Sequence, residues 1–145
     1  MNQSNFFEFI HDGNQLSYKM MSIFLKRFNH NVNISQVMLL EYIKRNGPSQ
    51  PSTLAKALGF TYGAITSMTN KLVEMEYINR VPQENDRRVI LLDITQSGVS
   101  LLKEAETIGE EIRNEIYSVL TPNELIQMKF IQDKLMNHVT SINNI

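Results

Sequence analysis

The chain has 145 residues, of which 42% are hydrophobic and 20% charged, so it can bury the core of one globular domain. Its formal net charge of -1 predicts no general attraction to nucleic acids or membranes, and the absence of cysteine excludes disulfide bonds, thiolate metal ligands and thiol redox sensing. No apolar run approaches the roughly 20 residues that cross a bilayer, and the polar start MNQSN lacks the order of a secretory signal, so we expect a cytoplasmic protein.

Helical spacing of apolar residues begins close to the N-terminus. The apolar side chains of 6–28 recur at intervals of three and four, which predicts a helix, and Gly13 is a point where that helix can bend or break. A second helix is predicted from Ser35, taken as its N-cap, and the pair Gly47-Pro48 ends it.

Two helices joined by a short turn follow, and they predict a helix-turn-helix. The first begins near Ser52 and ends at Gly59, a residue that readily adopts the positive φ of a turn. The second has Thr61 as its predicted N-cap. Its buried stripe is predicted to be Ile65, Met68, Leu72 and Met75, and its remaining face is short, polar and almost uncharged: Tyr62, Gly63, Thr66, Ser67, Asn70 and Lys71.

A β-hairpin is predicted directly after this helix. The β-rich runs YINRV and VILLDI flank a polar loop that contains Asp86, Arg87 and Arg88. A helix-turn-helix followed by such a hairpin has the element order of a winged helix. We therefore predict a mainly α fold with a small two- or three-stranded β wing.

Two long helices are predicted at the C-terminal end, over 95–119 and 122–142. The stretch TPNE at 121–124 is a capping box with proline at the first helical position. Each helix would be about 30 Å long at 1.5 Å per residue, too long for a small winged-helix unit to cover. We expect the N- and C-terminal helices of two chains to interleave in a homodimer; the alternative is a bundle closed within one chain.

The chain resembles the MarR (multiple-antibiotic-resistance regulator) family of bacterial winged-helix transcription factors. The resemblance lies in LAKALG, in AITSMTNKLVEMEYINRV, in the wing tip Asp86-Arg87-Arg88 and in LDITQSG. It implies one domain over 1–145, with dimerisation helices at about 1–30 and 96–145 and a DNA-binding lobe at about 34–95. It also implies that the helix after Thr61 enters the major groove and that the wing reaches the minor groove.

Each candidate residue has an expected role on DNA. The resemblance places the Asp and Arg of the family's Asp-x-Arg pattern on Asp86 and Arg88. Arg88 suits the negative minor groove, and Asp86 would hold the Arg88 side chain. Many family members carry arginine in place of Ser67, so direct guanine reading is lost at that position. Asn70 can pair with an adenine edge, whereas Arg80 and Arg87 suit phosphates. The predicted DNA-binding residues are Thr61, Tyr62, Gly63, Thr66, Ser67, Asn70, Lys71, Arg80, Asp86, Arg87 and Arg88.

The sequence therefore favours a ligand-responsive transcriptional regulator, a repressor acting as a homodimer on palindromic double-stranded DNA. The resemblance implies an effector crevice between the dimerisation helices and the DNA-binding lobe, for a small phenolic or anionic compound. We expect neither an enzyme nor a metal or cofactor site, because the three histidines are scattered and no phosphate-binding glycine loop or nucleophile elbow occurs. The rival interpretation is a winged-helix protein-interaction module that has lost DNA binding, which the neutral charge favours.

Overall fold

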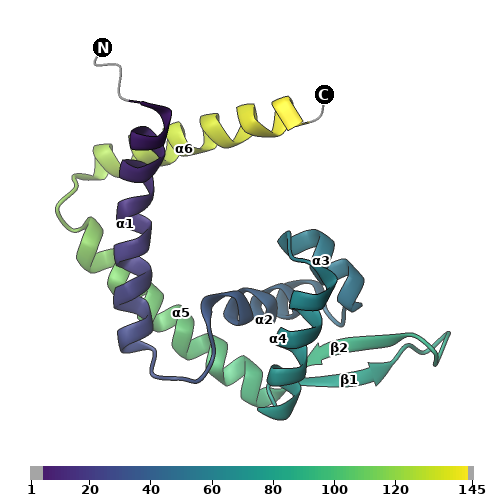
Figure 1. Ribbon diagram of the computed structural model, residues 1–145. Coiled ribbons are helices and arrows are strands. Elements are labelled where there is room, and N and C mark those ends of the chain that lie inside the picture. Colours follow the sequence, from purple (N-terminus) through teal and green to yellow (C-terminus); the bar gives the residue numbers. More distant parts are fainter. Residues whose placement is uncertain (1–4, 144–145) are drawn as a thin grey trace. The chain divides into compact units, whose positions relative to one another are not determined.

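The computed structural model describes residues 5–143, which form helices and one antiparallel β-hairpin (Figure 1). It divides into two compact units, Met1–Gly109 and Glu110–Ile145. The fold is mainly α with a small β wing, as the sequence predicted. In chain order the elements are α1 (Phe6–Arg27), α2 (Ile34–Asn46), α3 (Pro51–Leu58), α4 (Tyr62–Glu74), β1 (Ile78–Pro82), β2 (Ile90–Ile94), α5 (Gln96–Tyr117) and α6 (Pro122–Asn143).

The start of α2 corrects one prediction. Its N-cap is Asn33, and the expected cap, Ser35, lies inside the helix. The Asn33 side chain accepts a hydrogen bond from the backbone N–H of Gln36, and the Gln36 side chain accepts one from the backbone N–H of Asn33, both at 2.9 Å. This capping box satisfies two helix-end donors together. The first helix is not interrupted at Gly13, since α1 continues through that residue.

The helix-turn-helix forms where it was predicted. The turn contains Gly59 with φ of 70°, a left-handed conformation that favours glycine. The Thr61 hydroxyl oxygen caps α4 by accepting from the backbone N–H of Ala64 at 3.2 Å. The preceding helix begins at Pro51, one residue before the predicted Ser52, because the fixed φ of proline suits a first helical turn.

The end of α4 turns the chain sharply into β1. The backbone N–H of Tyr77 donates to the carbonyl of Leu72 at 2.9 Å, and that of Glu76 donates to the carbonyl of Val73 at 3.0 Å. This pair of bonds is a Schellman motif. Its left-handed residue is usually glycine; here Glu76 takes the position with φ of 60°.

The wing is a two-stranded hairpin, and one residue outside it, Ser49, forms an isolated β-bridge with β2. Its register pairs Ile78 with Ile94 and Pro82 with Ile90. Ser49 then exchanges two backbone hydrogen bonds with Leu92, at 3.0 and 2.9 Å. Extended backbone before α3 therefore holds the base of the wing.

The core of the first unit fixes the rotation of α4 about its axis. Ile65 and Leu72 are completely buried, and Met68 and Met75 pack against the core from its edge, as predicted. Thr69 is buried as well and satisfies its hydroxyl by donating to the carbonyl of Thr66 at 3.1 Å. The same buried cluster contains residues of α2, α3, β1, β2 and α5, namely Leu39, Leu40, Ile43, Leu54, Ile78, Leu92, Leu101 and Leu102.

The predicted capping box at the start of α6 is present in the second unit. The backbone N–H and then the hydroxyl of Thr121 donate to the Glu124 carboxylate, at 2.7 and 2.8 Å. These bonds hold the pKa of Glu124 below its ordinary value. They therefore stabilise the start of α6 fully at pH values above the ordinary carboxyl pKa, and this stabilisation is lost as the pH falls through the lowered pKa of Glu124.

Gly98 provides a test of the packing between the wing and α5. A Cβ at this position would lie 2.3 Å from the Tyr77 carbonyl oxygen and 2.7 Å from Ile94 Cγ1. We expect Gly98→Ala to lower the free energy of unfolding by about 1–3 kcal/mol, because backbone and core would have to shift. Chemical denaturation at a fixed protein concentration measures the change.

Gly109→Ala is the matched control in the same helix, since a Cβ there meets nothing within 4 Å. It should be neutral or stabilising by about 0.5–1 kcal/mol, because alanine restricts the unfolded chain and favours helix. Equal stabilities for the Gly98→Ala variant and the unsubstituted protein would contradict the close approach at Gly98.

Candidate nucleic-acid interface

The face of α4 that points away from the core is polar and exposed. All six residues predicted for it lie there, and the Tyr62 side chain is 63% exposed. The Thr66 hydroxyl donates to the carbonyl of Tyr62 at 2.9 Å, so in this arrangement it can accept a further hydrogen bond but has no proton left to donate. The exposed residues are Tyr62, Gly63, Thr66, Ser67, Asn70 and Lys71.

The N-terminus of α4 has the chemistry of an anion site. The Thr61 side-chain oxygen accepts a hydrogen bond from the backbone N–H of Ala64. The N–H groups of Tyr62 and Gly63 lie before the first hydrogen bond of the helix and so have no partner within it. A Cβ at Gly63 would meet nothing within 4 Å, so space is open beside these donors. A phosphate can bind such a helix end without a formal positive charge.

The tip of the wing is shaped by Asp86. Its carboxylate accepts from the backbone N–H of Arg88 at 3.0 Å, and its carbonyl accepts from the backbone N–H of Val89 at 2.9 Å. Asp86 was expected to hold the Arg88 side chain; the contact found is with the backbone of Arg88. Asp86 therefore closes the turn that carries the exposed side chains of Arg87 and Arg88.

The base of the wing contacts α4 through side chains. The Arg80 guanidinium, on β1, donates to the carbonyl oxygen of Asn70, on α4. Arg80 was expected to contact a phosphate and Asn70 an adenine, and the contact between the two residues was not predicted. Lys71, the next residue on α4, donates to the Asn31 side chain at 3.5 Å. The Arg80–Asn70 contact depends on the turn at Glu76. Because this turn has glutamate where glycine is usual, the sequence does not indicate it.

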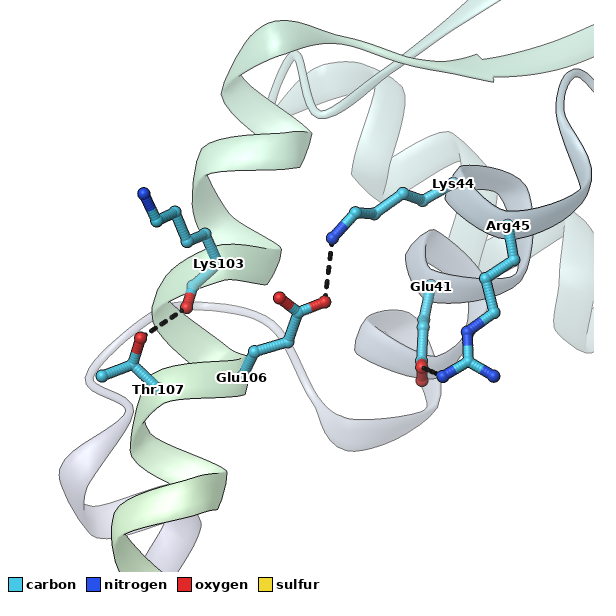
Figure 2. A network of polar contacts seen from close by, with 6 residues as sticks. All are labelled: Glu41, Lys44, Arg45, Lys103, Glu106 and Thr107. Atoms are coloured by element: carbon cyan, nitrogen blue, oxygen red, sulfur yellow. Dashed lines mark hydrogen bonds and ion pairs between the residues drawn. The ribbon is translucent and has the colours of Figure 1, made fainter.

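A pocket of about 230 Å³ lies between α2 and α5 within the first unit. Figure 2 shows the polar contacts at its edge: the Lys44 ammonium pairs with the Glu106 carboxylate at 2.8 Å, and Arg45 pairs with Glu41 at 2.6 Å. Both ionisable side chains that line the pocket are acidic. The lining residues are Phe24, Ile34, Val37, Met38, Glu41, Leu102, Ala105 and Glu106.

The described residues 5–143 contain neither a metal-binding cluster nor a membrane-spanning helix. No three histidine, aspartate or glutamate side chains gather there in a way that could hold a metal ion. None of the helices in that range is long and apolar enough to cross a membrane.

Comparison with known proteins matches the same elements. The model of the MarR family covers residues 32–90, from just before α2 to the first residue of β2. The multiple antibiotic resistance protein MarR of Escherichia coli strain K12 is 25% identical over 128 residues, 88% of each chain. The crystal structure of apo wild-type E. coli MarR matches with a TM-score of 0.75 at 24% identity, covering 91% of this chain and 97% of that chain.

A mutant E. coli MarR in complex with operator DNA matches with a TM-score of 0.72 at 24% identity, covering 91% of this chain and 99% of that chain. The helix-turn-helix, the wing and the helices around them therefore have counterparts in MarR structures over most of the chain. The winged-helix part of the chain, residues 32–90, matches the model of the MarR family, and the chain is similar to E. coli MarR over most of its length.

Proposed function

We propose that the protein is a double-stranded DNA-binding transcriptional regulator, a cytoplasmic repressor that acts as a homodimer. The observation that carries the proposal is the exposed polar face of α4 beside a wing tipped with Arg87 and Arg88. A related protein, E. coli MarR, has been solved with operator DNA. No cofactor is needed for this function, since recognition uses only side chains and backbone donors.

In this proposal α4 lies in the major groove, which is wide enough to admit a helix. The N-terminus of α4 at Thr61, Tyr62 and Gly63 receives a phosphate, and the exposed face reads base edges. The wing follows the backbone to the minor groove, where Arg88 meets the strongest negative potential. Arg87 contacts the flanking phosphates.

The apolar surface of α6 supports a dimer. Leu135 is 60% exposed and Val139 is 49% exposed, although both are large apolar side chains on a helix that carries further exposed apolar residues. Such a stripe favours a partner over water. We propose that a second copy covers it, with residues 1–145 forming one functional domain in which the terminal helices pair. A two-fold dimer would present two α4 helices to a palindromic operator, about one helical turn apart.

The pocket beside α2 and α5 is the proposed effector site. Most of its lining is apolar, no cationic side chain lines it, and the second carboxylate oxygens of Glu41 and Glu106 can accept a hydrogen bond from a phenol although Arg45 and Lys44 balance their charges. Of the two ligand classes expected from the sequence, an uncharged phenolic compound therefore fits better. Binding there can bias the position of the DNA-binding elements and thereby change their fit to the two half-sites.

The DNA-binding proposal is tested by titrating the protein against its flanking genomic DNA at several salt concentrations. We expect a protected palindrome and an affinity that falls steeply with salt, because phosphate contacts release counterions. Arg88→Ala should weaken binding to that site by about 1–3 kcal/mol. Arg45→Ala, on α2 and paired with Glu41, removes the same charge outside the proposed interface and should have little effect.

Two results would count against this proposal. A flat salt response with no protected sequence would favour the protein-interaction module instead. Equal affinities for Arg88→Ala and Arg45→Ala would remove the minor-groove role of Arg88 and leave α4 as the main contact.

The dimer is tested with a charge on α6. We expect Leu135→Asp to shift the protein from dimer to monomer in sedimentation equilibrium, because it places a carboxylate in an apolar interface. Asn137→Asp adds the same carboxylate to the same helix at an exposed polar position and should leave the dimer intact. A stable dimer of the Leu135→Asp variant would show that α6 does not form the interface.

The effector pocket is tested by thermal unfolding with phenol and with benzoate at equal concentrations. A ligand that binds only the folded state raises Tm, and we expect a larger rise with phenol than with benzoate. Val37→Phe, which fills part of the pocket, should remove the rise. A larger effect of benzoate would contradict the role assigned to the two carboxylates.

A further inference from the structure

The hydrogen bond between Arg80 and Asn70 joins the wing to the face of α4 that is proposed to read DNA. The guanidinium has donors and no acceptor, so the Asn70 atom that faces it has to be the carbonyl oxygen. The orientation of the Asn70 amide is therefore set by chemistry. Its NH₂ group is directed away from the shared bond.

This orientation changes what Asn70 can recognise. An asparagine that reads adenine uses its oxygen to accept from N6 and its nitrogen to donate to N7. In this protein the oxygen already accepts from a cationic donor. The N6 amino group of adenine would have to share that oxygen and lie beside the guanidinium, where two donors face each other unfavourably.

The pair as a whole presents donors. The Asn70 NH₂ group and the remaining guanidinium N–H groups of Arg80 lie at the junction of α4 and β1, and both side chains are exposed. In the major groove, guanine offers two acceptors on one edge, N7 and O6, whereas adenine offers one acceptor and one donor. We infer that Arg80 positions Asn70 so that the two residues together select guanine at one place in each half-site.

The inference rests on the proposed DNA-binding function and proposes other roles for two residues than those expected from the sequence. Asn70 was expected to read adenine, and Arg80 was expected to contact phosphate. It also supplies guanine recognition that Ser67 cannot give. The competing outcome is that Arg80 leaves Asn70 on binding and contacts the backbone, which would restore adenine reading.

The experiment uses the full chain and the operator defined by footprinting. Each G·C pair of the protected half-site is replaced in turn by A·T, and affinities are measured for the unsubstituted protein, Arg80→Ala, Asn70→Ala and the double variant. We expect the unsubstituted protein to lose about tenfold or more at one guanine. Arg80→Ala should abolish that preference or reverse it towards adenine, because the freed Asn70 oxygen can then accept from N6.

Two further variants separate positioning from charge. Arg87→Ala also removes a wing cation, and it should weaken binding to all operators equally with the base preference intact. Arg80→Lys keeps a donor facing the Asn70 oxygen and should keep a guanine preference. Circular dichroism checks that each variant is folded, since the Arg80–Asn70 bond is exposed and contributes little to stability.

The outcomes distinguish the inference from the function on which it rests. Absence of specific DNA binding by the unsubstituted protein would overturn the proposed function itself. Specific binding in which Arg80→Ala weakens guanine and adenine operators by the same factor would assign Arg80 to phosphate and overturn the inference alone. Additive effects of Asn70→Ala and Arg80→Ala on base preference would likewise show that the pair does not act as a unit.

Discussion

The burial of one face of α4 is the constraint on which the rest of the interface depends. Ile65 and Leu72 are completely buried, and burial of each such side chain contributes about 1.5–3 kcal/mol. Rotating the helix by one residue, about 100°, would expose them and bury polar neighbours without partners. The polar face is thus held outward by the core beneath it. The same packing sets the position from which Asn70 can meet Arg80.

The wing is held differently at its two ends. At its base, Ser49 bonds to Leu92 on both backbone groups, and Arg80 contacts α4. At its tip the contacts are local, made within the turn by Asp86. A side chain that recognises a nucleotide base needs a fixed geometry, and the contacts of Ser49 and Arg80 supply it at the α4 end of the wing. An arginine that responds to the width of the minor groove needs only a turn to carry it.

The features that the sequence predicted correctly depend on interactions between residues close in the chain. The Thr61 cap, the Gly59 turn and the Thr121–Glu124 capping box each involve groups three or four residues apart, so their patterns are visible in sequence. The error at Ser35 is also local: Asn33 is a comparable cap, and Gln36 decides between them by completing a capping box. By contrast, the Arg80–Asn70 bond requires the packed turn between a helix and a strand, which no local pattern encodes. The roles on DNA of the predicted contact residues stay predictions.

That turn also connects the DNA-binding face to α5. Of the non-glycine residues within 5–143, Glu76 alone has a positive φ, a conformation that costs about 1 kcal/mol for a residue with a Cβ. Its carbonyl accepts from the Thr95 hydroxyl at 2.7 Å, and the same hydroxyl oxygen accepts from the backbone N–H of Gly98 in the first turn of α5. One threonine therefore secures both the turn that leads to Arg80 and the start of the helix whose later residues line the pocket. A ligand that displaces α5 has to carry Thr95 with it or break this bond, and either change acts on the turn that places Arg80 beside Asn70.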